Sequence, residues 1–219
     1  MIRLHHVPFS RSFRVLWLLE ELGLDCELIR YSIRDGSLRD PAYLAKSPAG
    51  RVPALEIDGE VIFESAAILQ ILCERHPQAG LAPAPGAPDR ARFLEIIGFA
   101  ETMASLIENL NMQHLFLRDP SQASPVVLKL ITARLRSTLG AMETLLGDQD
   151  YLLPSGFSAA DAMMGFNLFA APYYVDLSRF PGLEAYRARL EAREAYKTAR
   201  AREGEQDIYP RDFLPLPER

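Results

Sequence analysis

Two serines stand in the segment Val7–Val15 of this 219-residue chain, where a buried strand is expected to give way to a helix. Backbone N–H groups and the helix dipole favour a negative charge at such a helix start. Ser10 or Ser12 could simply cap the helix, or a hydroxyl there could stabilise an anion such as a thiolate. The two cysteines, Cys26 and Cys73, are distant in the sequence, so the thiolate would belong to a ligand.

One serine hydroxyl at a helix start is sufficient to ionise a thiol near neutral pH. A free thiol has a pKa of about 8.5, and lowering it by about two units requires roughly 2.7 kcal/mol. A hydrogen bond to a charged group contributes about 1.5–3 kcal/mol, and the helix terminus adds about 0.3–1 kcal/mol. Thiolate stabilisation is therefore within reach of either serine.

Two further positions could recognise a peptide-like ligand. Glu64 and Ser65 begin another expected helix, where the helix terminus could hold a carboxylate and Glu64 could pair with an amine. Together they would recognise an α-amino acid group, although a plain cap and a solvated charge explain the same two residues. Pro53 begins an expected strand, and a cis Val52–Pro53 bond would turn the Val52 backbone toward a ligand lying alongside.

The elements around these residues alternate between strand and helix patterns in the first part of the chain. Strand, helix, strand favours a parallel pair with a right-handed crossover, and Asp58-Gly59 between apolar runs indicates a type I′ hairpin. The expected order is β-α-β, a short helical or irregular stretch, then β-β-α. The strands are expected near 2–7, 28–33, 52–57 and 60–63, with one helix between the first two strands and another from Ser65 to about His76.

A proline-rich segment at 76–88 separates this part from a second one that shows helical stripes and almost no strand pattern. Residues 162–171 are apolar nearly all round, which predicts a buried central helix. Ser158 and Asp161 before that helix have the spacing of a capping box. One more helix is expected after Pro181-Gly182, followed by a tail that packs or frays.

Composition narrows the class of protein. The net charge is −5 with no cluster of Lys and Arg, which argues against a nucleic-acid partner. No apolar run is long enough to span a membrane, and the first residues lack the pattern of a secretion signal. Two distant cysteines fit a reducing compartment. We therefore expect a cytoplasmic protein without a membrane or nucleic-acid partner, and no metal site, because no His or Cys pair has ligand spacing.

Five segments, taken together in their order, resemble the cytosolic glutathione S-transferases, and in particular bacterial members of the serine type. Each segment alone is weakly specific, but the set extends over nearly the whole chain. The segments are Ser10–Val15, Glu20–Gly23, Ser47–Leu55, Glu64-Ser65 and Phe157–Asp161.

This resemblance implies an α/β thioredoxin-like domain at 1–77, a linker at 78–88 and an all-α domain at 89–219, usually as a homodimer. Glutathione, the co-substrate, would lie on the first domain, and the helical domain would bind a small hydrophobic electrophile. The site residues that the resemblance implies are Ser10 as the catalytic hydroxyl, the Val52 backbone for the cysteinyl part, Glu64 and Ser65 for the γ-glutamyl end, and Asp161 with Ser158 as a structural capping box.

The sequence departs from the family pattern at several positions. Ser47 stands where the family often has Asn, and Arg51 or Lys46 could hold the glycine carboxylate of glutathione. Ser12 competes with Ser10, which the motif register favours. The residues considered for the electrophile pocket, from topology alone, are Phe9, Phe13, Asn109, His114 and Tyr173.

The expected activity is the transfer of glutathione to an electrophile or a peroxide. Alternatives on the same fold are a glutathione-dependent reductase or dehalogenase, an isomerase, and a non-catalytic interaction protein. The isomerases of this family carry a denser run of Ser and Cys after the first strand, whereas this chain has no Cys there. An interaction protein often lacks the serine or the Glu-Ser pair, and both are present here.

Overall fold

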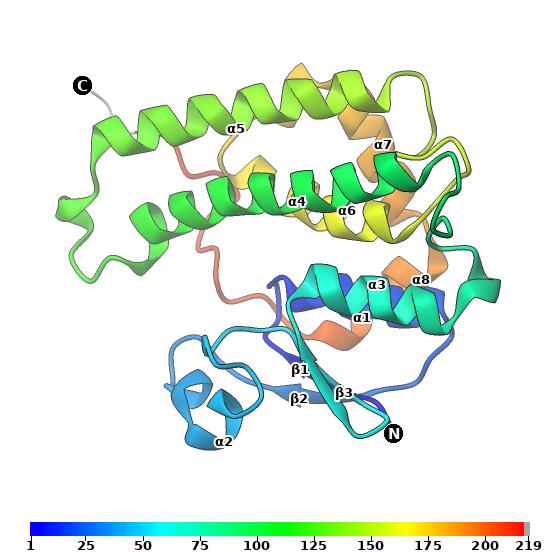
Figure 1. Ribbon diagram of the computed structural model, residues 1–219. Coiled ribbons are helices and arrows are strands. Elements are labelled where there is room, and N and C mark those ends of the chain that lie inside the picture. Colours follow the sequence, from blue (N-terminus) through cyan, green and yellow to red (C-terminus); the bar gives the residue numbers. More distant parts are fainter. Residues whose placement is uncertain (217–219) are drawn as a thin grey trace. The chain divides into compact units, whose positions relative to one another are not determined.

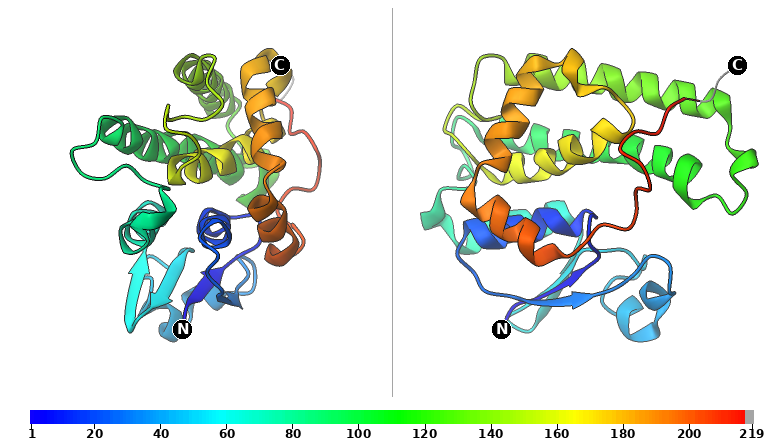
Figure 2. Two further views of the ribbon diagram at one scale, coloured as in Figure 1. Left: turned by 90° about the vertical axis from the view of Figure 1, so that its right-hand side faces the viewer. Right: turned by 180° about the vertical axis from the view of Figure 1, so that it is seen from behind.

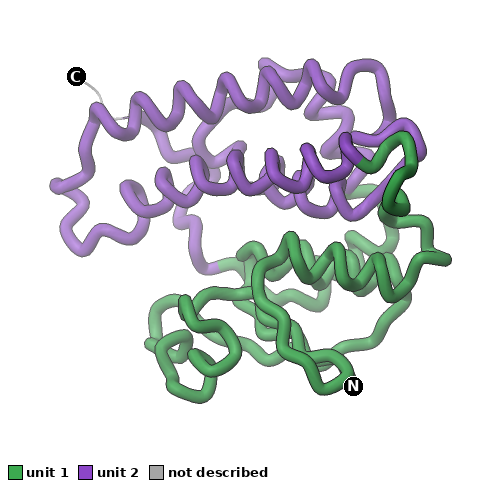
Figure 3. Tube along the Cα trace, viewed as in Figure 1, with its two compact units in different colours: residues 1–90, 191–206 green, residues 91–190, 207–219 purple. Residues whose placement is uncertain are grey.

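The computed structural model describes residues 1–216, which form two compact units. Figure 3 colours them separately. The first unit contains residues 1–90 together with 191–206, and the second, helical unit contains residues 91–190 together with the chain from 207 onward. A segment expected among the C-terminal helices therefore packs with the N-terminal residues.

A four-stranded sheet forms the centre of the first unit, with the strand order β2-β1-β3-β4. β1 (Arg3–His6) forms a parallel pair with β2 (Glu27–Arg30), as predicted. On its other side, β1 forms an antiparallel pair with β3 (Ala54–Ile57). β4 (Glu60–Phe63) forms the predicted hairpin with β3. Asp58 and Gly59 both have positive φ, +52° and +83°, which is the backbone geometry of a type I′ turn.

Helices cover both faces of this sheet (Figures 1 and 2). α1 (Ser12–Glu21) and α3 (Ser65–Arg75) lie on one face, and the short α2 (Pro41–Leu44) lies on the other, where its Tyr43 ring is 5.5 Å from the ring of His5. α8 (Glu194–Glu203) packs against α1. α1 is buried all round along Ser12–Leu19 and not on one face only.

The second unit is built from helices, as the sequence predicted. α4 (Arg90–Asn111) ends in a π-helical turn at Met112–Phe116 and is followed by α5 (Pro125–Leu146), α6 (Ala159–Ala170) and α7 (Pro181–Glu191). The expected central helix is α6, which is buried along almost its whole length.

The capping box before α6 is confirmed. The Asp161 carboxylate accepts hydrogen bonds from the Ser158 N–H at 2.8 Å, from the Leu152 N–H at 3.0 Å and from the Tyr186 hydroxyl at 2.6 Å. The tail packs on this unit: Tyr209 stacks on Tyr173 with 3.8 Å between ring centroids. Asp161 thus ties the start of α6 to the preceding loop and to α7.

One helix was predicted after Pro181, whereas the structure has two, α7 and α8. The chain leaves helical geometry at Arg193, although the sequence there contains neither Gly nor Pro. The Arg193 guanidinium forms two hydrogen bonds of 2.7 Å to the Glu21 carboxylate of α1. The break between α7 and α8 therefore coincides with a tertiary contact, and a local sequence pattern cannot indicate such a contact. Within residues 1–216 no helix has both the length and the apolar character needed to cross a membrane.

Candidate active site

The loop between β1 and α1 presents the two candidate serines in different ways. Ser10 is half-buried, and its hydroxyl lies 2.8 Å from the Val7 carbonyl oxygen and 2.7 Å from the Ser12 Oγ. Ser12, the first residue of α1, is completely buried, and its Oγ lies 2.8 Å from the His6 Nδ1. Of the two hydroxyls, only that of Ser10 belongs to a side chain with access to solvent.

The proton positions in this cluster follow from the state of His6. Burial lowers the pKa of His6 to about 3, so the ring is neutral at pH 7. Its Nε2 is 3.2 Å from the Glu203 carbonyl oxygen and must be the donor there, which leaves Nδ1 to accept the proton of Ser12. The Ser12 oxygen in turn accepts the Val7 N–H at 3.3 Å. The hydroxyl proton of Ser12 is therefore committed to His6, whereas that of Ser10 has a choice of acceptors.

Phe9, directly before Ser10, adopts a left-handed backbone conformation with φ of +59°. This geometry costs an ordinary residue about 1–2 kcal/mol. The Phe9 N–H donates a hydrogen bond of 2.9 Å to a carboxylate oxygen of Glu203, which is fully buried at the end of α8. Glu203 also forms an ion pair with Arg200, one turn earlier in the same helix. The loop that carries Ser10 is thus fastened to α8.

The pair Glu64 and Ser65 lies where β4 passes into α3. Ser65 is the first residue of α3, and its buried Oγ accepts a hydrogen bond of 3.0 Å from the guanidinium of Arg14, which is also buried. Glu64 is exposed, has a positive φ of +72°, and makes no side-chain cap to the helix. The plain-cap interpretation therefore does not describe Ser65, whose side chain is bound by Arg14, whereas the exposed Glu64 agrees with the interpretation of this residue as a solvated charge.

The segment before β3 is held by side chains of the α2 region. The Arg51 carbonyl oxygen accepts hydrogen bonds from the Tyr43 hydroxyl at 2.6 Å and from the Ser47 hydroxyl at 2.7 Å. The next residue, Val52, is half-buried, and its bond to Pro53 is cis. Ser47, which departs from the family pattern, therefore fixes the backbone one residue before Val52.

The two candidates for a glycine carboxylate differ in their surroundings. The Lys46 ammonium lies 2.9 Å from the Glu56 carboxylate, which also lies 2.7 Å from the Nε2 of His5. The Lys46 charge is thus already balanced by a carboxylate, and these contacts lower the pKa of Glu56, with Lys46 as the largest cause. Arg51 has an exposed side chain on the segment that leads to Val52.

Of the residues expected to line an electrophile pocket, the two in the first unit, Phe9 and Phe13, are buried. In the first unit, Phe13 is fully buried against Trp17 and Tyr196, with ring centroids 6.2 Å and 5.5 Å away. The suggestion that Phe13 lines a pocket is therefore wrong, because this ring belongs to the core formed by α1 and α8. Phe9 is buried as well, with the Arg200 guanidinium 5.6 Å from its ring centroid.

The other three pocket candidates lie in the helical unit. Asn109 is exposed and donates to the Ser105 carbonyl oxygen, the His114 ring lies 5.4 Å from that of Tyr174, and Tyr173 stacks on Tyr209. The hydroxyls of Tyr174 and Tyr209 both bind the Asn111 side-chain oxygen. An aromatic and amide cluster thus stands at the end of α4, and sequence inspection identified two of its members.

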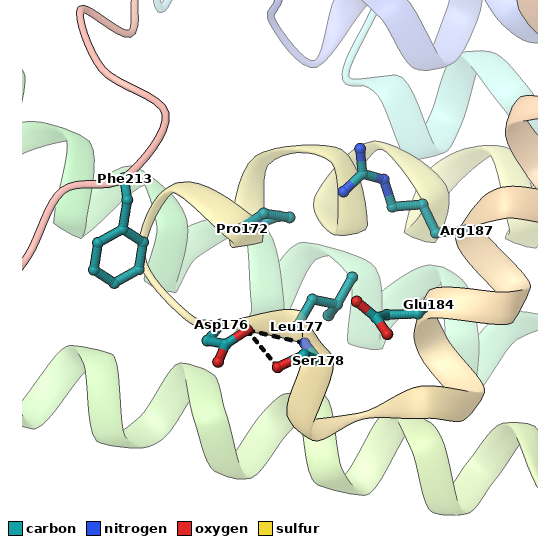
Figure 4. A pocket seen from close by; sticks show the side chains of 7 residues that line it. All are labelled: Pro172, Asp176, Leu177, Ser178, Glu184, Arg187 and Phe213. Carbon is teal, nitrogen blue, oxygen red and sulfur yellow. Dashed lines mark hydrogen bonds between the residues drawn. The ribbon is translucent and has the colours of Figure 1, made fainter.

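Figure 4 shows a separate open hollow of about 560 Å³ on the helical unit. Its polar side chains are partly engaged with each other: Asp176 accepts hydrogen bonds from the N–H and the hydroxyl of Ser178. None of the predicted site residues lines it, so we assign it no part in the site. The lining residues are Pro172, Asp176, Leu177, Ser178, Glu184, Arg187 and Phe213.

Sequence reasoning missed three residues of the first unit that position the predicted ones: His6, Arg14 and Glu203. Strand alternation places His6 on the face of β1 opposite to His5, which makes the two a poor metal pair but does not indicate the bond of His6 to Ser12. Arg14 belongs to the predicted motif Ser10–Val15, whose pattern indicates no role for its side chain. Glu203 is 194 residues from Phe9 along the chain, so no local pattern could relate them. Among residues 1–216 no group of three or more His, Cys, Asp or Glu side chains could hold a metal ion.

Comparisons with known proteins agree with this arrangement. Residues 4–80 match the family model "Glutathione S-transferase, N-terminal domain", and residues 125–189 match "Glutathione S-transferase, C-terminal domain". The chain is 31% identical to glutathione S-transferase 3 of Schizosaccharomyces pombe over 183 residues, 78% of this chain and 74% of the relative. It is 33% identical to a maleylacetoacetate isomerase of Pseudomonas aeruginosa over 194 residues, 87% of this chain and 91% of the relative.

Among solved structures, the chain is similar to a sphingomonad glutathione S-transferase in complex with glutathione. The TM-score is 0.79 at 29% identity, covering 92% of this chain and 98% of that one.

Proposed function

Because the chain belongs to the glutathione S-transferase family, we propose that it is a serine-type glutathione transferase whose catalytic residue is Ser10. The sheet with its helices is the thioredoxin-like part of the family's fold, and the helical unit is its all-α part. The single observation that carries the choice of Ser10 is that this residue is half-buried, whereas Ser12 is buried and its hydroxyl is committed to His6.

In this proposal the Ser10 hydroxyl turns from its present acceptors and donates to the thiolate of glutathione. The thiolate sulfur then bonds to an electrophilic carbon of a small hydrophobic substrate as the leaving group departs from that carbon with the electron pair. With a peroxide, the sulfur bonds to one oxygen as the O–O bond breaks, and the other oxygen leaves and is protonated to the alcohol. The buried Ser12 stays in place and supports the loop. The start of α1 contributes its dipole to the same negative charge.

The remaining contacts would recognise the rest of the tripeptide. The open Glu64 carboxylate would pair with the ammonium of the γ-glutamyl end, and Ser65 at the start of α3 would bind its carboxylate. The Val52 backbone would pair with the cysteinyl backbone. The glycine carboxylate would be bound by Arg51, whose exposed side chain lies directly before Val52.

A second activity, glutathione-dependent isomerisation, is favoured by one specific observation. The maleylacetoacetate isomerase of Pseudomonas aeruginosa is 33% identical, and the match covers 91% of its length. The segment Phe9-Ser10-Arg11-Ser12 lacks the cysteine that the family's isomerases carry there. An assay of cis–trans isomerisation of maleylacetoacetate with glutathione, beside a panel of conjugation substrates, decides between the two.

The test of Ser10 is the variant Ser10→Ala, with Ser12→Ala as its matched control. Ser10→Ala should leave glutathione affinity within about twofold and raise the pKa of the bound thiol by about one unit or more, which is tenfold less thiolate at a pH below that pKa. The thiolate's ultraviolet absorbance reports this pKa, and conjugation rates report kcat. Unchanged conjugation in Ser10→Ala together with loss in Ser12→Ala would contradict the assignment.

Calorimetry with glutathione separates an enzyme from an interaction protein of the same fold. We expect binding at millimolar ligand or below. We also propose a cytoplasmic protein, a homodimer and a role in detoxification, in keeping with the resemblance.

A further inference from the structure

The C-terminal end of α8 lies against the loop that carries Ser10. Gly204, the residue after the helix, lies beside Pro8, and a Cβ there would be in ordinary van der Waals contact with the proline ring, at 3.5 Å. The Glu203 carbonyl oxygen accepts the Nε2–H of His6 at 3.2 Å, and its side chain accepts the Phe9 N–H at 2.9 Å. One residue at the end of α8 therefore holds both the end of β1, at His6, and the loop, at Phe9.

Both points bear directly on the placement of Ser10. The bond to His6 orients the ring whose other nitrogen accepts the Ser12 hydroxyl, and Ser12 is the neighbour of the Ser10 hydroxyl. The bond to Phe9 is made at the residue that adopts a left-handed backbone immediately before Ser10. A Phe has no steric preference for that geometry, so an external contact must favour it.

The Glu203 carboxylate is suited to this task because it is buried and its charge is balanced. It is 0% exposed, and it forms an ion pair with Arg200. The Arg200 guanidinium lies 5.6 Å from the ring centroids of both Phe9 and Phe13. A hydrogen bond from an N–H to a carboxylate is stronger than one to a neutral oxygen, and burial keeps water from competing for it.

We propose that Glu203 is a positioning residue that holds Phe9 in its left-handed conformation and thereby aims the Ser10 hydroxyl at the sulfur of glutathione. This inference rests on the proposed function of Ser10. Glu203 itself does not touch the substrate. Without its carboxylate, Phe9 relaxes toward negative φ, and the direction of the following Ser10 side chain changes. The glutathione contacts on the segments of Val52 and Glu64 remain in place.

The experiment compares Glu203→Ala, Glu203→Gln and Ser10→Ala. In Glu203→Ala the pKa of the bound thiol should rise by about one unit and kcat should fall about tenfold, while KM for glutathione stays within about twofold. Glu203→Gln keeps an oxygen that can accept the Phe9 N–H, so it should recover most of kcat and a thiol pKa near that of the unmodified enzyme. If Glu203→Ala does not fold, Glu203→Asp, whose carboxylate is drawn back by one methylene, takes its place with the same expectation.

Arg202→Ala serves as the control for a merely structural role of α8. Arg202 binds Glu20 and the Cys26 carbonyl oxygen, away from the Ser10 loop, so its loss should lower the melting temperature without moving the thiol pKa. An unchanged thiol pKa in Glu203→Ala, or a Gln variant as impaired as the Ala variant, overturns the role of Glu203. If Ser10→Ala itself leaves the thiol pKa unchanged, the proposed function of Ser10 fails, and the positioning role fails with it.

Discussion

At the scale of the residue, the Ser10 hydroxyl must exchange one partner for another when glutathione binds. It now donates to a neutral oxygen, that of Val7 or of Ser12, and such a bond contributes about 0.5–1.5 kcal/mol, against about 1.5–3 kcal/mol for a bond to a charged group. Exchanging the neutral acceptor for the thiolate therefore stabilises the thiolate by the difference between these two hydrogen-bond energies. Together with about 0.3–1 kcal/mol from the helix start, this difference lowers the thiol pKa by about one to two units. The estimate from sequence, which ignored the existing partners, lay at the upper end of this range.

Glu64 and Ser65 should respond differently to substitution, although both are assigned to the γ-glutamyl end. Glu64→Gln should weaken glutathione binding about tenfold and leave the free energy of unfolding within about 0.5 kcal/mol, because the side chain is exposed. Ser65→Ala should weaken binding and also lower stability by about 1–3 kcal/mol, because the buried Arg14 loses this acceptor. Calorimetry and urea unfolding measure the two effects.

Glu74→Gln is the control for this pair, since it removes an exposed charge at the other end of the same helix. Glu74→Gln should change neither the affinity for glutathione nor the free energy of unfolding. Glutathione affinity unaltered in Glu64→Gln would refute the pairing of its carboxylate with the ligand's ammonium.

His6 makes stability depend on pH. Its pKa is about 3 in the folded protein, below its unfolded value of about 6.5, because burial disfavours the charged ring. The unfolded chain therefore binds the extra proton first. The contribution of neutral His6 to stability is complete above about pH 6.5 and declines by about 1.4 kcal/mol per pH unit as the pH falls toward 3.

The variant His6→Asn, which keeps an oxygen that can accept the Ser12 hydroxyl proton, isolates this effect. Urea unfolding of both proteins between about pH 4 and pH 6.5 should give a shallower loss of stability in the variant, since the other titrating groups are common to both. Parallel pH profiles for the two proteins would show that His6 does not bind a proton on unfolding.

At the scale of the element, the sequence predicts what short-range signals encode. Asp58-Gly59 determines the β3–β4 hairpin, and the capping box of Ser158 and Asp161 marks the start of α6, because each signal lies within four residues. By contrast, the Arg193–Glu21 contact at the break between α7 and α8 joins residues more than 170 positions apart. The bond between Glu203 and Phe9 likewise joins α8 to the loop before α1 over more than 170 positions. Such contacts follow from tertiary packing and leave no local pattern.

Asp161 should contribute far more to stability than an ordinary helix cap. Its carboxylate accepts bonds from Ser158, Leu152 and Tyr186 inside the helical unit, so Asp161→Asn places an amide N–H against buried donors and should cost about 3 kcal/mol. Ser158→Ala should cost about 1 kcal/mol. Urea unfolding measures both, and kcat per folded molecule should be unchanged.

Ser124→Ala provides the comparison, because the Ser124 Oγ accepts the Val127 N–H at 3.3 Å as the cap of α5 without a wider network. It should resemble Ser158→Ala. A loss of less than about 1 kcal/mol in Asp161→Asn would show that the buried network adds little to a simple cap.

At the scale of the whole molecule, residue patterns predicted two parts separated by the proline-rich segment at 76–88, whereas the expectation of a homodimer came only from the resemblance. Periodicity predicted helices after residue 89 but gave no reason for residues 191–206 to join the first unit. The same limit applies to assembly. An interface between two copies is made of side chains that look like any exposed residue in the sequence.

Val61 and Phe63 are the side chains of the first unit on which the homodimer proposal can be tested. They point the same way on β4, an edge strand of the sheet, and are 44% and 46% exposed. In a twofold dimer each contact occurs twice, and burying one Phe is worth about 1.5–3 kcal/mol. Because only about half of the Phe63 side chain is left to bury, each copy gains about half of that value if this strand contributes to the interface. Phe63→Ser should therefore weaken the dimer by about 1.5–3 kcal/mol, roughly ten- to a hundredfold in Kd.

Analytical ultracentrifugation should find the unmodified protein at twice the chain mass of 24.5 kDa and Phe63→Ser at the monomer mass when diluted to low micromolar concentration. Ile33→Ser is the matched control, because Ile33 is an exposed apolar residue in the loop after β2 and its loss should leave the dimer intact. A monomeric unmodified protein would refute the homodimer. A dimer that is equally stable in Phe63→Ser would place the interface elsewhere than on β4, since removal of two buried rings has to weaken any interface that contains them.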